Sequence, residues 1–73
     1  MKIFTIEHQE FGYDCYLGHT IVANSAEQVR EIAKSKSADE GQEVWDKAEV
    51  IECGDYTCHR TEPFILMSDF RAG

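Results

Sequence analysis

One stretch of the chain carries an amphipathic pattern at the helical period, and it constrains the fold more than any other. Residues 24–37 have the sequence NSAEQVREIAKSKS. Apolar residues recur there at steps of three or four positions, the spacing that places side chains on one face of a helix. They are Ala26, Val29, Ile32 and Ala33. The sequence therefore predicts one helix that docks through this narrow apolar face.

Signals at both ends of this stretch agree with a helix. Ser25 followed by Gln28 is typical of a capping box, in which the hydroxyl accepts from a free backbone amide and the glutamine reaches back. Glu27 near the start and Lys34 near the end complement the helix dipole. The polar residues 35–41 finish with a glycine, which disfavours continuation of the helix.

The other apolar stretches are short and predict strands, two before the helix and two after it. They are Lys2 to His8, Cys15 to Ala23, Val44 to Cys53 and Phe64 to Met67. The run FILM places four apolar residues in succession, which is typical of a strand covered on both faces. We therefore expect an α+β fold in which residues 1–73 form a single small globular domain. Its four-stranded sheet, in the order β-β-α-β-β, has the Lys2–His8 and Phe64–Met67 strands at its centre and the helix on one face.

The sequence also bears on location and redox state. No apolar run approaches the roughly 18 residues needed to span a membrane, and the start lacks a signal-peptide core. We therefore expect a cytoplasmic protein. Cys53 and Cys58 flank a turn, so a disulfide between them is geometrically possible, but the reducing cytosol favours free thiols.

Negative charge is concentrated in one part of the chain. The formal net charge is −7, and residues 39–55 hold seven acids against the single Lys47. Six of these acids recur at every third position. They are Glu40, Glu43, Asp46, Glu49, Glu52 and Asp55. Acids three residues apart point to alternating faces in a strand and spread around the axis of a helix. They therefore do not form a single line of charge on one face.

Two interpretations of this acidic segment remain open. The first is an edge strand that carboxylates protect against pairing with other chains, and we favour it. The second is a surface for a partner with a basic face. Direct binding to nucleic acid is not expected under either interpretation, because phosphates would be repelled.

Residue types that bind metals or act as nucleophiles are present without a recognisable spacing. They are Cys15, Cys53 and Cys58 together with His8, His19 and His59. Neither a C-x2-C nor an H-x3-H spacing is present, and Cys58 and His59 are adjacent, so in a strand they would point to opposite faces. A Cys–His pair can form in space rather than in sequence. We expect no enzyme activity, no metal and no cofactor.

Aromatic residues offer candidate anchors for a partner. Phe11, Tyr13 and Tyr16 lie close together in sequence, while Trp45 stands inside the acidic segment. Tyrosine and tryptophan are favoured at protein interfaces. A small domain also buries its only tryptophan beside its helix, and we favour that interpretation for Trp45.

Five short motifs in this order resemble a set of small bacterial and phage-encoded proteins. They are YDCY, IVANSAEQVR, a lone Trp45, VIECG and FILMSDFRAG. The resembling proteins show YDxY, a VVxA strand, SExxAR in the helix, a tryptophan and a terminal GVILxSFxAG. This chain has Pro63 and Phe64 where that pattern has Gly-Val. The resemblance implies an origin in a phage or another mobile element and a structural rather than catalytic signature. The opening MKIF and the final Ala72-Gly73 give a second resemblance, to ubiquitin-like β-grasp domains.

These observations together predict a small acidic module that binds and blocks a host protein, as a monomer or dimer and without a membrane. The expected target has a basic nucleic-acid-binding surface, as in an inhibitor of the anti-CRISPR or anti-restriction type. The alternative is a structural or assembly protein of a phage or mobile element that acts through homo-oligomer contacts. The candidate partner-binding residues are Glu40, Glu43, Trp45, Asp46, Glu49, Glu52, Asp55 and Tyr56.

Overall fold

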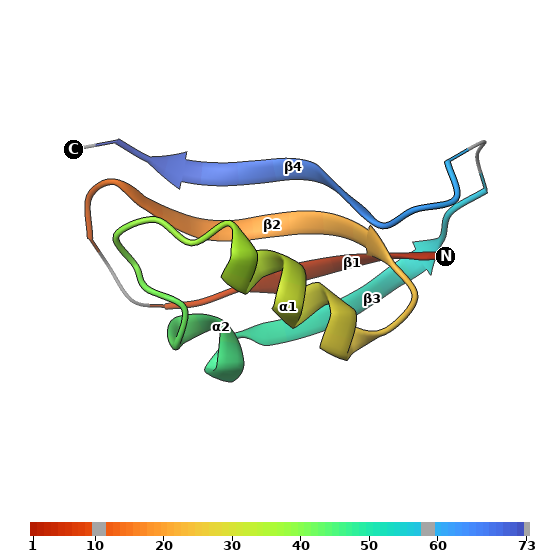
Figure 1. The fold of residues 1–73 in the computed structure, drawn as a ribbon, viewed down its shortest axis with the longest axis horizontal. Coiled ribbons are helices and arrows are strands. Elements are labelled where there is room, and N and C mark those ends of the chain that lie inside the picture. The colour runs from red at the N-terminus through yellow and green to blue at the C-terminus, as the bar shows by residue number, and fades with distance from the viewer. Residues whose placement is uncertain (10–11, 58–59, 73) are drawn as a thin grey trace.

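A computed structural model describes residues 1–9, 12–57 and 60–72 of the chain. It contains four strands and two helices in chain order (Figure 1). They are β1 (Lys2–Glu7), β2 (Cys15–Ala23), α1 (Ala26–Ser35), α2 (Val44–Lys47), β3 (Glu49–Asp55) and β4 (Phe64–Arg71). The predicted α+β fold is confirmed, with a single four-stranded sheet and the main helix α1 packed on one face of it.

The sheet is antiparallel, and its strand order is β3-β1-β2-β4. The two strands at its centre are therefore β1 and β2. The predicted central position of Phe64–Met67 is wrong, because β4 is an edge strand. Its four consecutive apolar residues are not all buried: Ile65 packs against the core, whereas Leu66 and Met67 are exposed. An apolar run therefore did not indicate burial on both faces here.

Helix α1 begins where the capping signal placed it. The Ser25 hydroxyl accepts a hydrogen bond of 3.2 Å from the Gln28 amide. The Gln28 side chain in turn accepts one of 2.7 Å from the amide of Asn24, one residue before the cap. The predicted docking face is confirmed: Val29 and Ala33 are buried, and Ile32 is partly buried against the core.

The short helix α2 was not expected. A strand beginning at Val44 was predicted, and this prediction is wrong over 44–47. The Trp45 and Asp46 amides each donate 3.2 Å bonds to carbonyls three residues earlier, which forms a single helical turn. Arg30 of α1 secures its end, because its guanidinium donates to the carbonyls of Trp45 at 2.8 Å and Ala48 at 2.7 Å. The turn rotates the tryptophan inward, and β3 begins after it.

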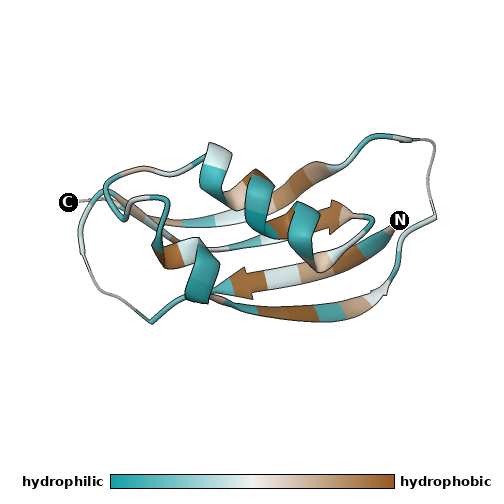
Figure 2. Cartoon of the chain, turned by 60° about the horizontal axis from the view of Figure 1, so that its bottom comes forward, coloured by the Kyte–Doolittle hydropathy of each residue, from teal (hydrophilic) through white to brown (hydrophobic). Residues whose placement is uncertain are grey.

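The core lies between the sheet and the two helices. Its buried members are Phe4, Ile6, Ile21, Ala23, Val29, Ala33, Trp45 and Ala48. The strands in Figure 2 change colour between brown and paler or teal segments along their length, as expected where alternate side chains face opposite sides. Within the described ranges, no helix is long and apolar enough to cross a membrane.

Candidate functional site

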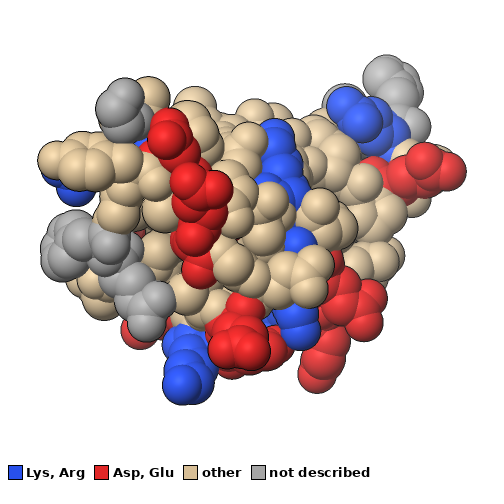
Figure 3. All heavy atoms as spheres, turned by 60° about the vertical axis from the view of Figure 1, so that its left-hand side comes forward, with Lys and Arg blue, Asp and Glu red and all other residues tan. Residues whose placement is uncertain are grey.

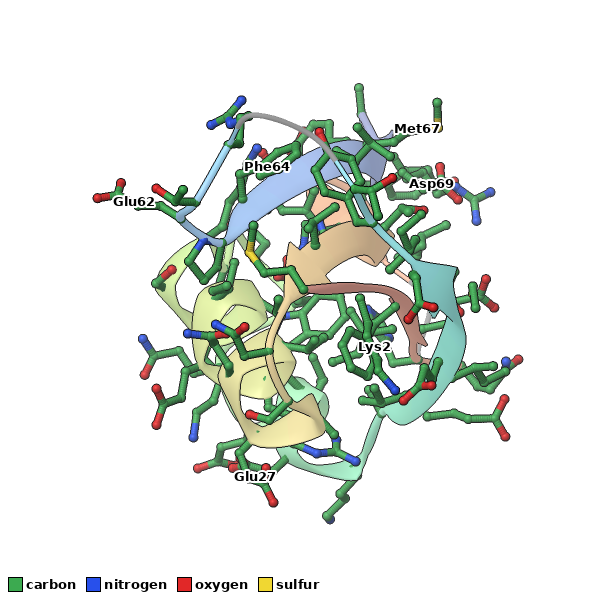
Figure 4. The ribbon with its side chains drawn as sticks, turned by 90° about the vertical axis from the view of Figure 1, so that its right-hand side faces the viewer. Lys2, Glu27, Glu62, Phe64, Met67 and Asp69 are labelled. Atoms are coloured by element: carbon green, nitrogen blue, oxygen red, sulfur yellow. The ribbon has the colours of Figure 1, made fainter. Side chains whose placement is uncertain are left out.

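Among the residues that the structure describes, no helix covers one face of the sheet, and we call it the open face. Phe4 and Ile6 of β1 point into the core, so the alternate residues of β1 point the other way. The register then places side chains of all four strands on this second face. They are Ile3, Thr5 and Glu7, Thr20 and Val22, Glu49 and Ile51, and Met67 and Asp69. In Figure 4, Met67 and Asp69 lie on the opposite side of the sheet from Glu27 of α1.

The open face contains a depression of about 570 Å³. Its lining comes from β1, β2, β4 and the start of the β1–β2 connection. The lining residues include Thr5, Glu7, Leu17, Gly18, Thr20, Met67 and Asp69. A Cβ atom at Gly18 would lie 2.9 Å from the Ile6 carbonyl oxygen and 3.0 Å from Cγ of Glu7. Only glycine fits between these neighbours, and its missing side chain leaves the depression open.

Two carboxylates stand directly opposite each other at one end of the open face. Glu7 of β1 is the register partner of Glu49 of β3, and both side chains are exposed. Directly opposed side chains have Cβ atoms about 5 Å apart, and like charges in that position repel. Ile51, which is 50% exposed, lies two residues further along β3 on the same face. The result is an exposed apolar side chain beside two carboxylates.

The structure divides the predicted acidic residues among different roles, and Glu40 has a structural one. Its Oε1 accepts from the amides of Tyr16 at 3.0 Å and Ala38 at 3.1 Å. Its Oε2 accepts from the indole nitrogen of Trp45 at 3.0 Å. These three bonds hold the 36–43 connection, the start of β2 and the tryptophan together. Glu40 is therefore engaged within the fold.

Two further acids take part in ion pairs. Asp46 pairs with Lys34 of α1 at 2.9 Å, and Glu52 pairs with Lys2 at 3.1 Å. A bulge in β3 places Glu52 and Asp55 on the same face, since their register partners are Phe4 and Lys2. The bond to Glu52 and its charge, followed by the charge of Asp55, raise the pKa of Lys2 above its usual value. The expected alternation of acids three apart does not hold at this point.

Glu43, Glu49 and Asp55 remain exposed, and within the described ranges they form no ion pair. The two aromatic candidates are placed differently. Trp45 is fully buried, with its ring centroid 4.9 Å from that of His8, so it offers no exposed anchor. Tyr56 is half-buried and packs edge-on against Phe64 at 5.5 Å.

Three acids, Asp14, Asp39 and Glu40, lie near Cys15 at the end of the molecule where β2 begins. Figure 3 shows acidic side chains in a line down this end. Burial, followed by the charges of Glu40, Asp39 and Asp14, raises the pKa of the Cys15 thiol. Because the thiolate is the reactive form, this environment makes Cys15 a poor nucleophile.

In the described part of the chain, His19 is the one polar residue that is buried, with 4% of its surface exposed. Its ring lies between those of Tyr16, 4.9 Å away, and Trp45, 5.1 Å away. Nδ1 is 2.8 Å from the Ser68 hydroxyl, while Nε2 has no hydrogen-bond partner among the described residues. Burial first, and then the charge of Lys36, lower the pKa of His19 to about 4.

This environment predicts a loss of stability in acid. Between pH 6.5 and 4 the unfolded chain binds a proton at His19 that the folded chain does not. The free energy of unfolding should therefore fall by up to about 3 kcal/mol as the pH drops through this window. Urea denaturation at pH 7 and pH 4.5 checks this, with His19→Phe as the comparison. If the variant loses as much stability between the two pH values as the parent, His19 is not the responsible group.

The metal and thiol candidates gain no support from the described residues. No group of three His, Cys, Asp or Glu side chains within these residues is arranged to hold a metal ion. Cys53 is exposed and Cys15 is buried. Cys58 and His59 lie outside the described residues, as does Phe11, so the considered Cys53–Cys58 bridge does too.

Comparisons of the chain with protein-family models, with curated proteins and with solved structures find no match. The open face is the part that sequence reasoning missed, since Glu7 and Met67 were assigned only to strands. The alternation of apolar and polar residues in 4–7 was the signal that could have indicated it.

Proposed function

We propose that this chain is a small acidic protein-binding module that docks through its open face onto a partner with a basic nucleic-acid-binding surface, and so blocks that surface. The observation that carries the proposal is the opposed pair Glu7 and Glu49 beside the exposed Ile51. Lys47 lines a depression together with both carboxylates, but within the described residues no ion pair joins it or any other cation to them. Lysine or arginine side chains of a partner would relieve the repulsion within this pair.

The charge of the whole molecule supports the same choice of partner. A net charge of −7 steers the chain toward positive surfaces and away from nucleic acid. Once docked, its carboxylates would compete with phosphates for the same cationic side chains. The partner would then lose access to DNA or RNA without any chemical step.

Apolar contacts would add the stability that exposed charge pairs do not provide. Ile51 is half exposed, and Met67, which lines the depression, is 70% exposed. Exposed ion pairs contribute about 1 kcal/mol or less, whereas buried apolar side chains contribute about 1.5–3 kcal/mol each. The depression of about 570 Å³ is large enough to take a side chain from the partner.

This proposal keeps part of the predicted binding set and leaves part of it out. Glu49 belongs to the open face. Glu43 lies near this face, because Val44 and Lys47 line one depression together with Glu43 and another together with Glu49. The buried Trp45 and the internally bonded Glu40 are excluded. An origin in a phage or mobile element is part of the proposal, and inhibitors of CRISPR or restriction systems are the class that it suggests.

The test compares two variants that change net charge equally on opposite faces. Glu7→Gln with Glu49→Gln neutralises the open face, whereas Glu27→Gln with Glu31→Gln neutralises exposed acids on α1. Immobilised parent and variants are exposed to bacterial lysate at two salt concentrations, and bound proteins are identified by mass spectrometry. Duplex DNA is then added to elute them.

The expected result has three parts. The parent and the α1 variant capture the same nucleic-acid-binding proteins, the open-face variant loses them, and DNA or high salt releases them. Capture that is equal for both variants, or that DNA does not disturb, contradicts the proposal. Thermal melts of all three proteins confirm that the variants remain folded.

A further inference from the structure

The outer edge of β4 is the second unoccupied surface of the molecule. β4 spans eight residues, and within the described ranges it pairs only with β2, so one side of its backbone faces outward. Exposed apolar side chains gather on it: Leu66, Met67 and Phe70 are between 46% and 70% exposed. An edge strand with unpaired backbone groups and apolar side chains is a template for pairing with another strand.

The opposite edge of the sheet is built to prevent such pairing. β3 carries Glu49, Glu52 and Asp55, and like charges would meet if two copies joined there. β4 carries one acid and one base, so its own charge is balanced. Self-association of this strongly acidic chain is therefore least opposed at β4.

Helix α1 also leaves β4 uncovered. It packs on β2, β1 and β3, and in Figure 1 β4 lies at the far edge of the sheet from α2. On the helix side of β4, the Phe70 ring contacts Tyr16 at 4.8 Å and remains 46% exposed. A second strand beside β4 would place its own side chains against this ring.

The order of charges along β4 selects one register for a second copy. Asp69 and Arg71 are two residues apart, so both point to the same face. In an antiparallel pair of β4 strands with the two-fold axis at Phe70, each Asp69 lies opposite Arg71 of the other copy. An axis at Asp69 would place the Asp69 carboxylates of the two copies opposite each other. Axes at Met67 or Ser68 would extend the pairing across the bulge at Leu66.

We propose that two copies of the chain pair through the β4 edges, in the register centred on Phe70, so that their sheets join into one. Two Asp69–Arg71 pairs flank the contact, and the two Phe70 rings meet on the helix side. Arg71, which lies 5.5 Å from the Tyr13 ring centroid, is exposed and within reach of the partner strand. The dimer uses Asp69, which also lines the open-face depression, but it does not use Glu7, Glu49 or Ile51, which carry the proposed inhibitor function.

In this register only residues 69–71 of each β4 strand face β4 of the other copy, so the contact is small. Small interfaces are typical of weak, reversible association. We expect a monomer at a few micromolar and a dimer at several hundred micromolar, as orders of magnitude for an interface of this class. Sedimentation equilibrium over that range, with a reducing agent present, measures the dissociation constant. The reducing agent prevents disulfides through the exposed Cys53.

Charge exchange provides the decisive comparison. Asp69→Arg alone and Arg71→Asp alone each replace two attractive pairs with two repulsive ones, and each should weaken the dimer about tenfold or more. The double variant Asp69→Arg with Arg71→Asp restores attraction in this register and should recover most of the affinity. Phe70→Ser should weaken the dimer, whereas Ile51→Ser on the open face should not. Circular dichroism establishes that each variant is folded.

Several results would overturn the proposal. One is a parent that stays monomeric at several hundred micromolar. Another is a double charge exchange that fails to recover association when both single changes lose it. Dissociation by Ile51→Ser but not by Phe70→Ser would move the contact to the open face. Oligomers larger than a dimer would contradict this closed pair and would support the assembly role considered as the alternative function.

Discussion

Val29→Asp is expected to lower the free energy of unfolding by about 4 kcal/mol or more, which is enough to unfold a domain of this size. Val29 is fully buried on α1 and belongs to the core that includes Phe4, Ile6 and Ile21. An aspartate there would bury a carboxylate among apolar side chains, or force α1 away from the sheet. Urea denaturation followed by far-UV circular dichroism measures the change.

Ala26→Asp is the matched control for this prediction. Ala26 lies in the first turn of the same helix and is exposed, although the sequence pattern grouped it with the apolar face. An acid at this end is favourable to the helix dipole, so stability should stay within about 0.5 kcal/mol of the parent. Equal losses for both variants would mean that α1 does not dock through Val29.

The features of the fold that sequence predicted are those that local signals determine. The start of α1 is fixed by Ser25 and Gln28, and its docking face by the spacing of Val29 and Ala33. Both depend on residues within one or two helical turns of each other. The same holds for β1 and β2, where alternation and turn residues are close in sequence.

The features that sequence missed depend on contacts between distant residues. The helical turn α2 looks like the start of a strand in sequence, but Arg30 and Glu40 hold it from elsewhere in the chain. The edge position of β4 depends on which strand pairs with β2, and the apolar run alone did not show this. In sequence, the evenly spaced acids of residues 40–55 form one group. In the fold, one of them forms hydrogen bonds inside the structure, two form ion pairs, and the others are exposed.

Trp45→Ala is the second change expected to have a large effect, with a loss of about 4 kcal/mol in the free energy of unfolding. Trp45 is the largest fully buried side chain, and its ring packs against those of His8 and His19. Its removal leaves a cavity, and a small domain has few neighbouring side chains that can repack to fill it. The Glu40 carboxylate also loses one of the three donors that it bonds.

Trp45→Phe and Glu40→Gln separate packing from the hydrogen bond. Phenylalanine keeps most of the ring and loses the indole donor, so about 1–2 kcal/mol of stability should be lost. In the double variant the losses should not add, because both changes remove the same bond between Trp45 and Glu40. Far-UV circular dichroism must be the probe, since the only tryptophan is changed. If Trp45→Ala costs less than about 1 kcal/mol, the tryptophan is not a core residue, and its candidacy as a surface anchor would return.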